Sequence, residues 1–180
     1  NLKTLLSSGK YIIPVYQRNY AWGKAEISQL IRDINEFFQN STDKNYYIGS
    51  LVCFKRENGD YELIDGQQRH TTISLINAVL KSEPRNDKID AIPSTNLKFD
   101  SRKNAQQFLE ELHKASNMDE YLESTSISGI QNFKDAIAFI REEIQDKNFN
   151  LVEFAENFYN KVKFFIVEVP QDTDLNHYFE

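Results

Sequence analysis

The feature that most constrains the fold of this 180-residue chain is a glycine between a strand pattern and a helix pattern. Tyr61 to Ile64 has the composition of a short strand, and from Gln67 to Lys81 the apolar residues recur at helical spacing. Asp65-Gly66 stands between the two segments, where a glycine lets the backbone approach a ligand without interference from a Cβ atom. The middle of the chain is therefore predicted to run strand, tight turn, helix.

Other segments indicate further strands. Tyr11 to Ile13 precedes a proline, which biases it toward extended geometry. Tyr46 to Lys55 is rich in aromatic and β-branched residues and is expected to form a hairpin with the strand at residues 61–64. Asn58-Gly59 would supply the positive φ angles of the hairpin turn. One more strand, over residues 162–169, is expected to be buried and to return to the core before Pro170.

The remaining apolar periodicity is helical and predicts an α+β domain with a helical elaboration in its second half. Residues 1–81 would form the core. Residues 82–101 are polar and contain prolines, which indicates a flexible connection. Residues 102–180 would form the helical part, with Ser101 as the N-cap of its first helix.

Composition excludes several classes of protein. A hydrophobic content of 40% is too high for global disorder, and a net charge of −6 argues against a freestanding nucleic-acid binder held by bulk charge. The charge is uneven, because residues 1–81 carry 10 basic and 8 acidic side chains whereas residues 82–180 carry 11 and 19. A single cysteine, Cys53, and no apolar run of about 20 residues lead us to expect a cytoplasmic protein with no membrane partner.

The turn between the central strand and helix carries chemistry of its own. The unpaired N–H groups of the first helical turn point outward, and with the helix dipole they form an anion site. Arg69 lies in that turn and can add a forked contact to a phosphate or carboxylate, while Thr71 and Thr72 contribute hydroxyls. Asp65 has three open roles, since it can orient Arg69, hold a metal through phosphate-bound water, or act as a base. A purely structural alternative is that Asp65 caps the helix and the polar side chains after it are solvated.

A second segment, Ile13 to Trp22, brings three aromatic residues and an arginine together without helix or strand periodicity. That density favours a functional loop. Its rings can stack on a base or on Arg18. The alternative is that Tyr16, Tyr20 and Trp22 have only a structural role and pack against the sheet.

Together the two segments resemble the motif pair of the N-terminal domains of GmrSD-type, modification-dependent restriction endonucleases, a large bacterial family. That family shows I-P-x-Y-Q-R-x-Y-x-W near the start and D-G-Q-Q-R-x-T-T further along. The chain reproduces both, as Ile13 to Trp22 and Asp65 to Thr72. The resemblance covers the first 80 residues well, and the helical half carries little specific signal.

The resemblance implies a ParB/sulfiredoxin-like core with a small mixed sheet. It also implies a regulatory domain that binds or hydrolyses a nucleoside triphosphate with a divalent metal, magnesium. Such a domain would control the cleavage of foreign, modified DNA by a C-terminal nuclease domain or subunit. Carried over position by position, the resemblance assigns catalysis to Asp65, Gln67, Gln68 and Arg69, phosphate binding to Gly66, Gln67, Arg69, Thr71, Thr72, Gln17 and Arg18, and metal binding to Asp65.

Two departures from the family pattern stand out. His70 occupies a position that is commonly aliphatic, and we expect a partly buried helix histidine there. Asp174 to Glu180 is similar to the lead-in of a further N-x-R-G segment, so we expect the 180 residues to be a fragment of a longer protein. No nuclease pattern is visible, and His113, among Glu and Lys, is expected at the surface.

Two other functions stay open. The first half of the chain can be a DNA-recognition module without catalysis, whose basic side chains face a DNA backbone. The acidic helical half can instead be a scaffold that docks a partner protein. The basic side chains in question are Arg18, Lys24, Lys55, Arg56 and Arg69.

Overall fold

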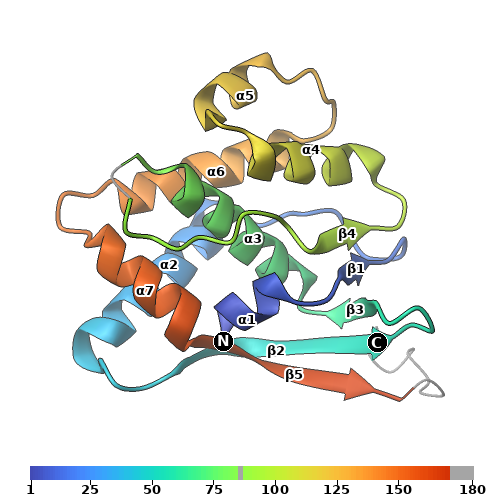
Figure 1. Ribbon diagram of the computed structural model, residues 1–180, viewed down its shortest axis with the longest axis horizontal. Helices are drawn as coiled ribbons and strands as arrows, with labels where there is room; N and C mark the ends of the chain where they lie inside the picture. The colour runs from blue at the N-terminus through green and yellow to red at the C-terminus, as the bar shows by residue number, and fades with distance from the viewer. Residues whose placement is uncertain (85–86, 171–180) are drawn as a thin grey trace.

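The structure is a computed structural model that describes residues 1–84 and 87–170. It is a mixed α+β fold, which confirms the predicted class. Figure 1 shows the strands in succession from β4 to β5, with α4, α5 and α6 at the end of the molecule that lies away from β5. The elements are α1 (Leu2–Ser7), β1 (Tyr11–Ile13), α2 (Lys24–Asn40), β2 (Tyr46–Lys55), β3 (Tyr61–Asp65), α3 (Gln67–Ser82), β4 (Leu97–Phe99), α4 (Lys103–Lys114), α5 (Met118–Ser124), α6 (Gln131–Ile144), α7 (Leu151–Lys161) and β5 (Val162–Val169).

The sheet has five strands in the order β4-β1-β3-β2-β5. β1 is parallel to both β3 and β4, and β2 is parallel to β5. β2 and β3 are antiparallel, as expected for a hairpin. This order brings β3, which ends at the candidate turn, to the centre of the sheet.

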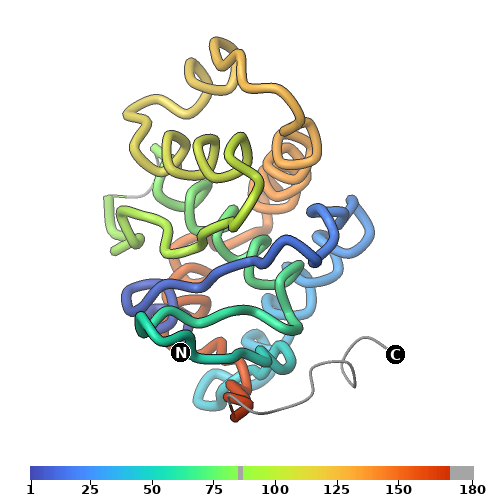
Figure 2. The backbone as a smooth tube through the Cα atoms, turned by 90° about the vertical axis from the view of Figure 1, so that its right-hand side faces the viewer, coloured from blue at the N-terminus to red at the C-terminus, as the bar shows by residue number. Residues whose placement is uncertain are grey.

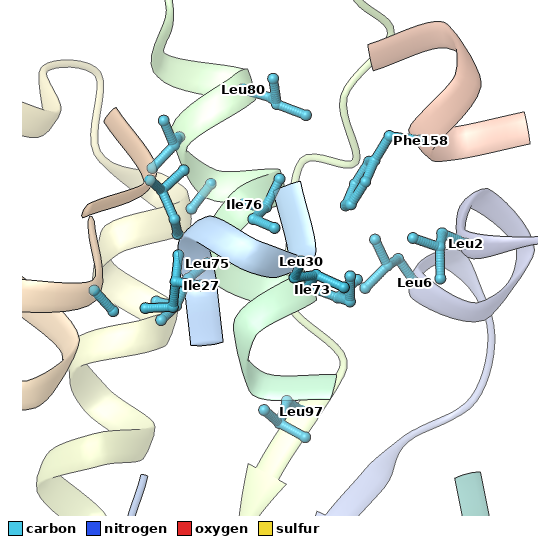
Figure 3. Packing of buried hydrophobic residues seen from close by; sticks show 14 of the residues in the cluster. Leu2, Leu6, Ile27, Leu30, Ile73, Leu75, Ile76, Leu80, Leu97 and Phe158 are labelled. Carbon is cyan, nitrogen blue, oxygen red and sulfur yellow. The ribbon is translucent and has the colours of Figure 1, made fainter. Parts of the chain in front are cut away.

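Helix α3 lies at the centre of the core. Of its 16 residues, 13 are buried, because other elements surround it instead of leaving one face in water. Figure 3 shows Leu75, Ile76 and Leu80 of α3 among apolar side chains of α2 and α7, such as Ile27 and Phe158. The candidate turn is thus the start of the most enclosed helix in the fold.

The hairpin turn differs from its prediction at one residue. Gly59 has a φ of 91°, but no residue other than glycine has a positive φ among the described residues, so the expectation for Asn58 was wrong. Gly59 N–H donates to Arg56 O at 3.0 Å, and Arg56 N–H donates to Asp60 O at 2.8 Å. The side chain of Asn58 accepts from Asp60 N–H at 3.0 Å. One left-handed residue is therefore enough to reverse the chain.

The segment expected as a connection, 82–101, contributes to the sheet and to the core. Its residues 97–99 form β4, which pairs with β1. Asn77 of α3 holds Ile92 through two hydrogen bonds, donating to its carbonyl at 3.0 Å and accepting from its N–H at 3.1 Å. The polar composition of this segment concealed these long-range contacts. The following helix, α4, starts at Lys103 with Arg102 as N-cap, so the prediction of Ser101 as N-cap was wrong.

The last strand is an edge strand and not the buried strand that its composition predicted. Phe165, Ile166 and Val167 are 55%, 54% and 43% exposed, because β2 is the only described strand that pairs with β5. The short helix α1 was not predicted at all. Asp174 to Glu180, expected to lead into a further motif, lies outside the described residues.

No helix in the described part of the chain combines the length and the apolar character needed to cross a membrane.

Candidate functional site

The candidate site is built on the turn between β3 and α3. Gly66 has a φ of 97°, in the left-handed region, and is the N-cap of α3. A Cβ atom at this position would lie 2.9 Å from the carbonyl oxygen of Ser50 and 3.0 Å from Leu51 Cδ1. Position 66 therefore requires glycine for its conformation and for its close approach to β2. The predicted order of strand, tight turn and helix is confirmed.

The start of α3 is open to an acceptor. No side chain of the described residues caps the helix, and the first helical bond runs from His70 N–H to Gly66 O at 3.0 Å. Asp65 Oδ1 accepts from the N–H of Gly66 at 2.9 Å, and Gly66 is the residue before the first residue of the helix. Asp65 therefore does not cap α3, and the first-turn N–H groups have no partner within the helix.

Arg69 is the positive charge of this turn. Its side chain is exposed, and its guanidinium lies against Gly49 of β2, where a Cβ atom would stand 2.9 Å from Nη1. Burial raises the pKa of the nearby Tyr46 phenol, and the charge of Arg69 acts in the opposite direction. Within the described residues Arg69 forms no ion pair. An anion at the turn would thus meet a guanidinium that no carboxylate of the described residues neutralises.

Two buried glutamines connect the first motif to the turn through hydrogen bonds to the backbone. Gln17 Nε2 donates to the carbonyl of Ile64 at 2.8 Å. Gln68 Oε1 accepts from Ala21 N–H at 2.9 Å, and its Nε2 donates to Asn19 O at 3.1 Å. The structure thus brings the two motifs together. Both amides are engaged by backbone, and the ligand contacts assigned to them by resemblance stay predictions.

The two threonines lie behind the turn. Thr71 donates to Gln67 O at 2.7 Å and Thr72 donates to Gln68 O at 2.8 Å. Because the Thr72 hydroxyl is used in this way, Tyr20 is the donor in the 2.8 Å bond between the Tyr20 and Thr72 oxygens. Both threonines are buried, so they support the first turn from inside. The side chain of Gln67 is also buried, whereas Arg18 is exposed.

Sequence reasoning missed two residues at this site. Gly49, with a φ of 119°, provides the space for Arg69, and an isolated glycine within a strand is the signal that points to such a close approach. Arg102 donates to the carbonyls of Gln17 and Arg18. No local pattern marks Arg102, because its partners are 84 and 85 residues away.

A divalent metal fits this turn only together with a ligand. No group of three or more His, Cys, Asp or Glu side chains that could hold a metal exists among the described residues. Asp65 is a single exposed carboxylate. Magnesium is commonly held by one or two carboxylates plus substrate phosphates, so Asp65 suits a metal that arrives with the phosphates and not a metal bound by the protein alone.

The two described histidines are structural. His70 is fully buried, its two ring nitrogens have no hydrogen-bond partner among the described residues, and burial lowers its pKa to about 4. Its ring packs on that of Tyr11, with a centroid distance of 5.1 Å. His113 is also buried, with Nδ1 donating to Leu109 O at 2.7 Å, so the expected surface position was wrong. His113 lies on the same face of α4 as Leu109 and Leu112, and this face packs into the core.

Comparison with known proteins adds one finding on the family. The family model described as GmrSD restriction endonuclease, N-terminal domain, matches residues 2–180. The match spans the helical second half as well as both motifs. A search of curated proteins found no match.

Proposed function

The chain belongs to the family of GmrSD restriction endonuclease N-terminal domains, and on that premise we propose that its α3 turn binds the phosphates of a nucleoside triphosphate. Membership in the family means a role in the restriction of modified DNA. Nucleotide binding would make the domain the regulatory part of such a system, and hydrolysis would occur in the full-length protein. A ParB/sulfiredoxin-like ancestry of the core is part of the same proposal.

One observation carries the proposal, the uncapped start of α3 beside the unpaired guanidinium of Arg69. Backbone N–H groups at a helix start and a nearby guanidinium are complementary to phosphate oxygens. Gly66 keeps the turn free of a side chain, so that a phosphate can approach the backbone. The two hydrogen bonds of the Gln68 side chain hold Asn19 and Ala21 beside the turn. They limit the rearrangement of the loop that nucleotide binding would require.

The chemistry of the turn would rest on positioning and charge. The first-turn N–H groups and Arg69 would hold the phosphates and neutralise charge that develops on them. Asp65 would orient an attacking water or serve as the protein ligand of a magnesium ion bound to the phosphates. Such an ion would supply further charge neutralisation.

Calorimetric titration tests the proposal. ATP and GTP with magnesium would be titrated into the wild type and into Arg69→Ala, and we expect Arg69→Ala to bind at least about tenfold more weakly, because a hydrogen bond to a charged group contributes roughly 1.5–3 kcal/mol. Arg32→Ala is the matched control, since Arg32 on α2 is exposed and paired with Glu143 at 2.9 Å. Equal affinity of Arg69→Ala and wild type, with unchanged thermal unfolding, would show that the turn is not the phosphate site.

The DNA-recognition alternative has less support. Lys24 is paired with Glu142 at 3.0 Å, and Arg56 is paired with both Glu62 and Asp100, at 3.0 and 2.6 Å. Two of the basic residues in question are therefore already neutralised within the protein. A steep salt dependence of duplex binding would favour this alternative over the nucleotide proposal.

A further inference from the structure

A cavity of about 440 Å³ lies beside the first motif, and none of its lining residues belongs to α3. It is an open pocket lined by the starts of α4 and α6 and by Asn19 and Tyr20 of the motif. Figure 2 shows α4 and α6 next to each other at one end of the molecule. The volume lies within the range of small-molecule sites, which is roughly 300–1,000 Å³.

The charged side chains that line the cavity are basic. Arg102 and Lys103 contribute to the wall, and no carboxylate does so among the described residues. Arg102 is partly buried, and its contacts with described residues are the carbonyl oxygens of Gln17 and Arg18. Burial lowers the pKa of its guanidinium. A guanidinium has five N–H donors, so Arg102 keeps donors for an anion after both carbonyls are satisfied.

The backbone adds to this positive field. α4 begins at Lys103 and α6 at Gln131, and neither helix has a side-chain cap. Both starts lie in the cavity wall. The positive ends of both helix dipoles therefore lie at this wall, although the Phe133 N–H already donates to Ile130 O at 3.1 Å.

The rest of the wall suits a planar ring with polar edges. Phe99 is half-buried and supplies aromatic surface, whereas Tyr20 and Phe133 are buried and stack on each other with a centroid distance of 5.4 Å. Asn132 Nδ2 donates to Tyr20 O at 2.9 Å and Asn104 Nδ2 donates to Ser128 O at 3.0 Å. No described residue donates to the side-chain oxygens of these two asparagines, so both can accept from the amino group of a base.

We propose that this cavity binds a nucleotide unit, with its phosphate at Arg102 and Lys103 and its base against Phe99. The unit is either a free mononucleotide or one residue of a single-stranded DNA, since both present the same phosphate and base. The lining of the cavity contains no residue of α3, although Asn19 and Tyr20 in its wall are hydrogen-bonded to Gln68 and Thr72 of α3. A ligand here would touch the loop from Gln17 to Ala21, which Gln68 also holds.

The test uses three probes, deoxycytidine monophosphate, deoxycytidine and a short single-stranded DNA. Each is titrated into wild type, Lys103→Glu and Lys147→Glu, with affinity measured by calorimetry. Lys103 and Lys147 are both exposed, and the two variants change the net charge equally, so Lys147→Glu controls for general charge effects. Backbone amide spectra of the wild type then locate the ligand, because Gly129 lines the cavity and Gly66 marks the α3 turn.

We expect the monophosphate to bind more tightly than the nucleoside, to shift the Gly129 amide, and to bind about tenfold more weakly to Lys103→Glu. The tighter of the monophosphate and the DNA then identifies the source of the unit. No binding of any probe, or equal weakening by Lys147→Glu, would overturn the inference. Shifts at Gly66 without shifts at Gly129 would also overturn it while leaving the triphosphate proposal standing.

Discussion

The guanidinium of Arg69 lies against the backbone of Gly49, so closely that a Cβ atom at position 49 would stand 2.9 Å from Nη1. The two residues belong to α3 and β2, elements that meet beneath the candidate turn. Gly49 has a φ of 119°, which L side chains rarely adopt. A side chain at position 49 would therefore displace the guanidinium of Arg69 from where it lies.

Gly49→Ala is expected to weaken nucleotide binding and to destabilise the fold by about 1–2 kcal/mol, because it adds backbone strain and displaces Arg69. Chemical denaturation and calorimetry measure the two effects separately. The matched control is Gly59→Ala, whose φ of 91° is also positive but whose Cβ would meet nothing within 4 Å. Gly59→Ala should lose stability and keep its nucleotide affinity, and an equal loss of affinity in both variants would contradict a role through Arg69.

Gln68→Ala should loosen the first motif. It removes the amide that accepts from Ala21 N–H and donates to Asn19 O, and each broken bond costs roughly 1 kcal/mol or more when the partner stays buried. Trp22, the only tryptophan, follows directly in this loop and packs against the core, so its fluorescence should shift to longer wavelength. Gln67→Ala serves as control, and an unchanged Trp22 emission in Gln68→Ala would show that the loop is held by other contacts.

The parts of the site that local sequence could predict are those made of neighbouring residues. The run from β3 through Gly66 into α3 followed from composition and one glycine. The hydrogen bonds that join the two motifs could not be predicted in this way. Gln68 and Ala21 are 47 residues apart, and Arg102 and Gln17 are 85 apart. Periodicity records which face of a helix is apolar, but not which distant backbone a polar side chain will meet.

The same limit explains why β4 and the exposure of β5 were not predicted. Residues 97–99 form a strand only because β1 offers them a parallel partner, and a polar, proline-containing stretch carries no signal of that partner. Residues 165–167 have the composition of a buried strand, yet the order of the sheet leaves them at its edge. Burial depends on topology, which pattern alone does not determine.

Asn77→Ala should destabilise the protein by several kcal/mol, although Asn77 is a polar residue within a core helix. Its amide donates to Ile92 O and accepts from Ile92 N–H and, at 2.6 Å, from the Tyr159 hydroxyl. Removing it leaves buried polar groups without partners, each at roughly 1–3 kcal/mol. Urea denaturation measures the loss, and limited proteolysis should cut near Ile92 first.

The control for Asn77 is Asn160→Ala, since Asn160 is exposed and bonded only to Glu156 O within its own helix among the described residues. Asn160→Ala should change the free energy of unfolding by no more than about 0.5 kcal/mol. A similarly small change in Asn77→Ala would mean that water replaces its contacts.

His70 should make the protein less stable as the pH falls. The pKa of the folded-state imidazole is about 4 instead of 6.5, so below pH 6.5 the unfolded chain takes up a proton that the folded protein does not. The contribution of the neutral ring is therefore complete above pH 6.5 and is lost progressively toward pH 4, to a total of about 3 kcal/mol. Urea denaturation at a series of pH values between 6.5 and 5 measures the slope.

His70→Leu should reduce the slope of the free energy of unfolding against pH by the contribution of one proton, which is up to about 1.4 kcal/mol per pH unit. It should also leave stability at pH 7 equal or higher, because an apolar side chain of similar size replaces two buried nitrogens that have no partner. His113 is the matched comparison, since burial lowers its pKa as well and its titration should persist in His70→Leu. An unchanged slope in His70→Leu would mean that His70 is hydrated or charged in the folded protein, contrary to its packing on Tyr11.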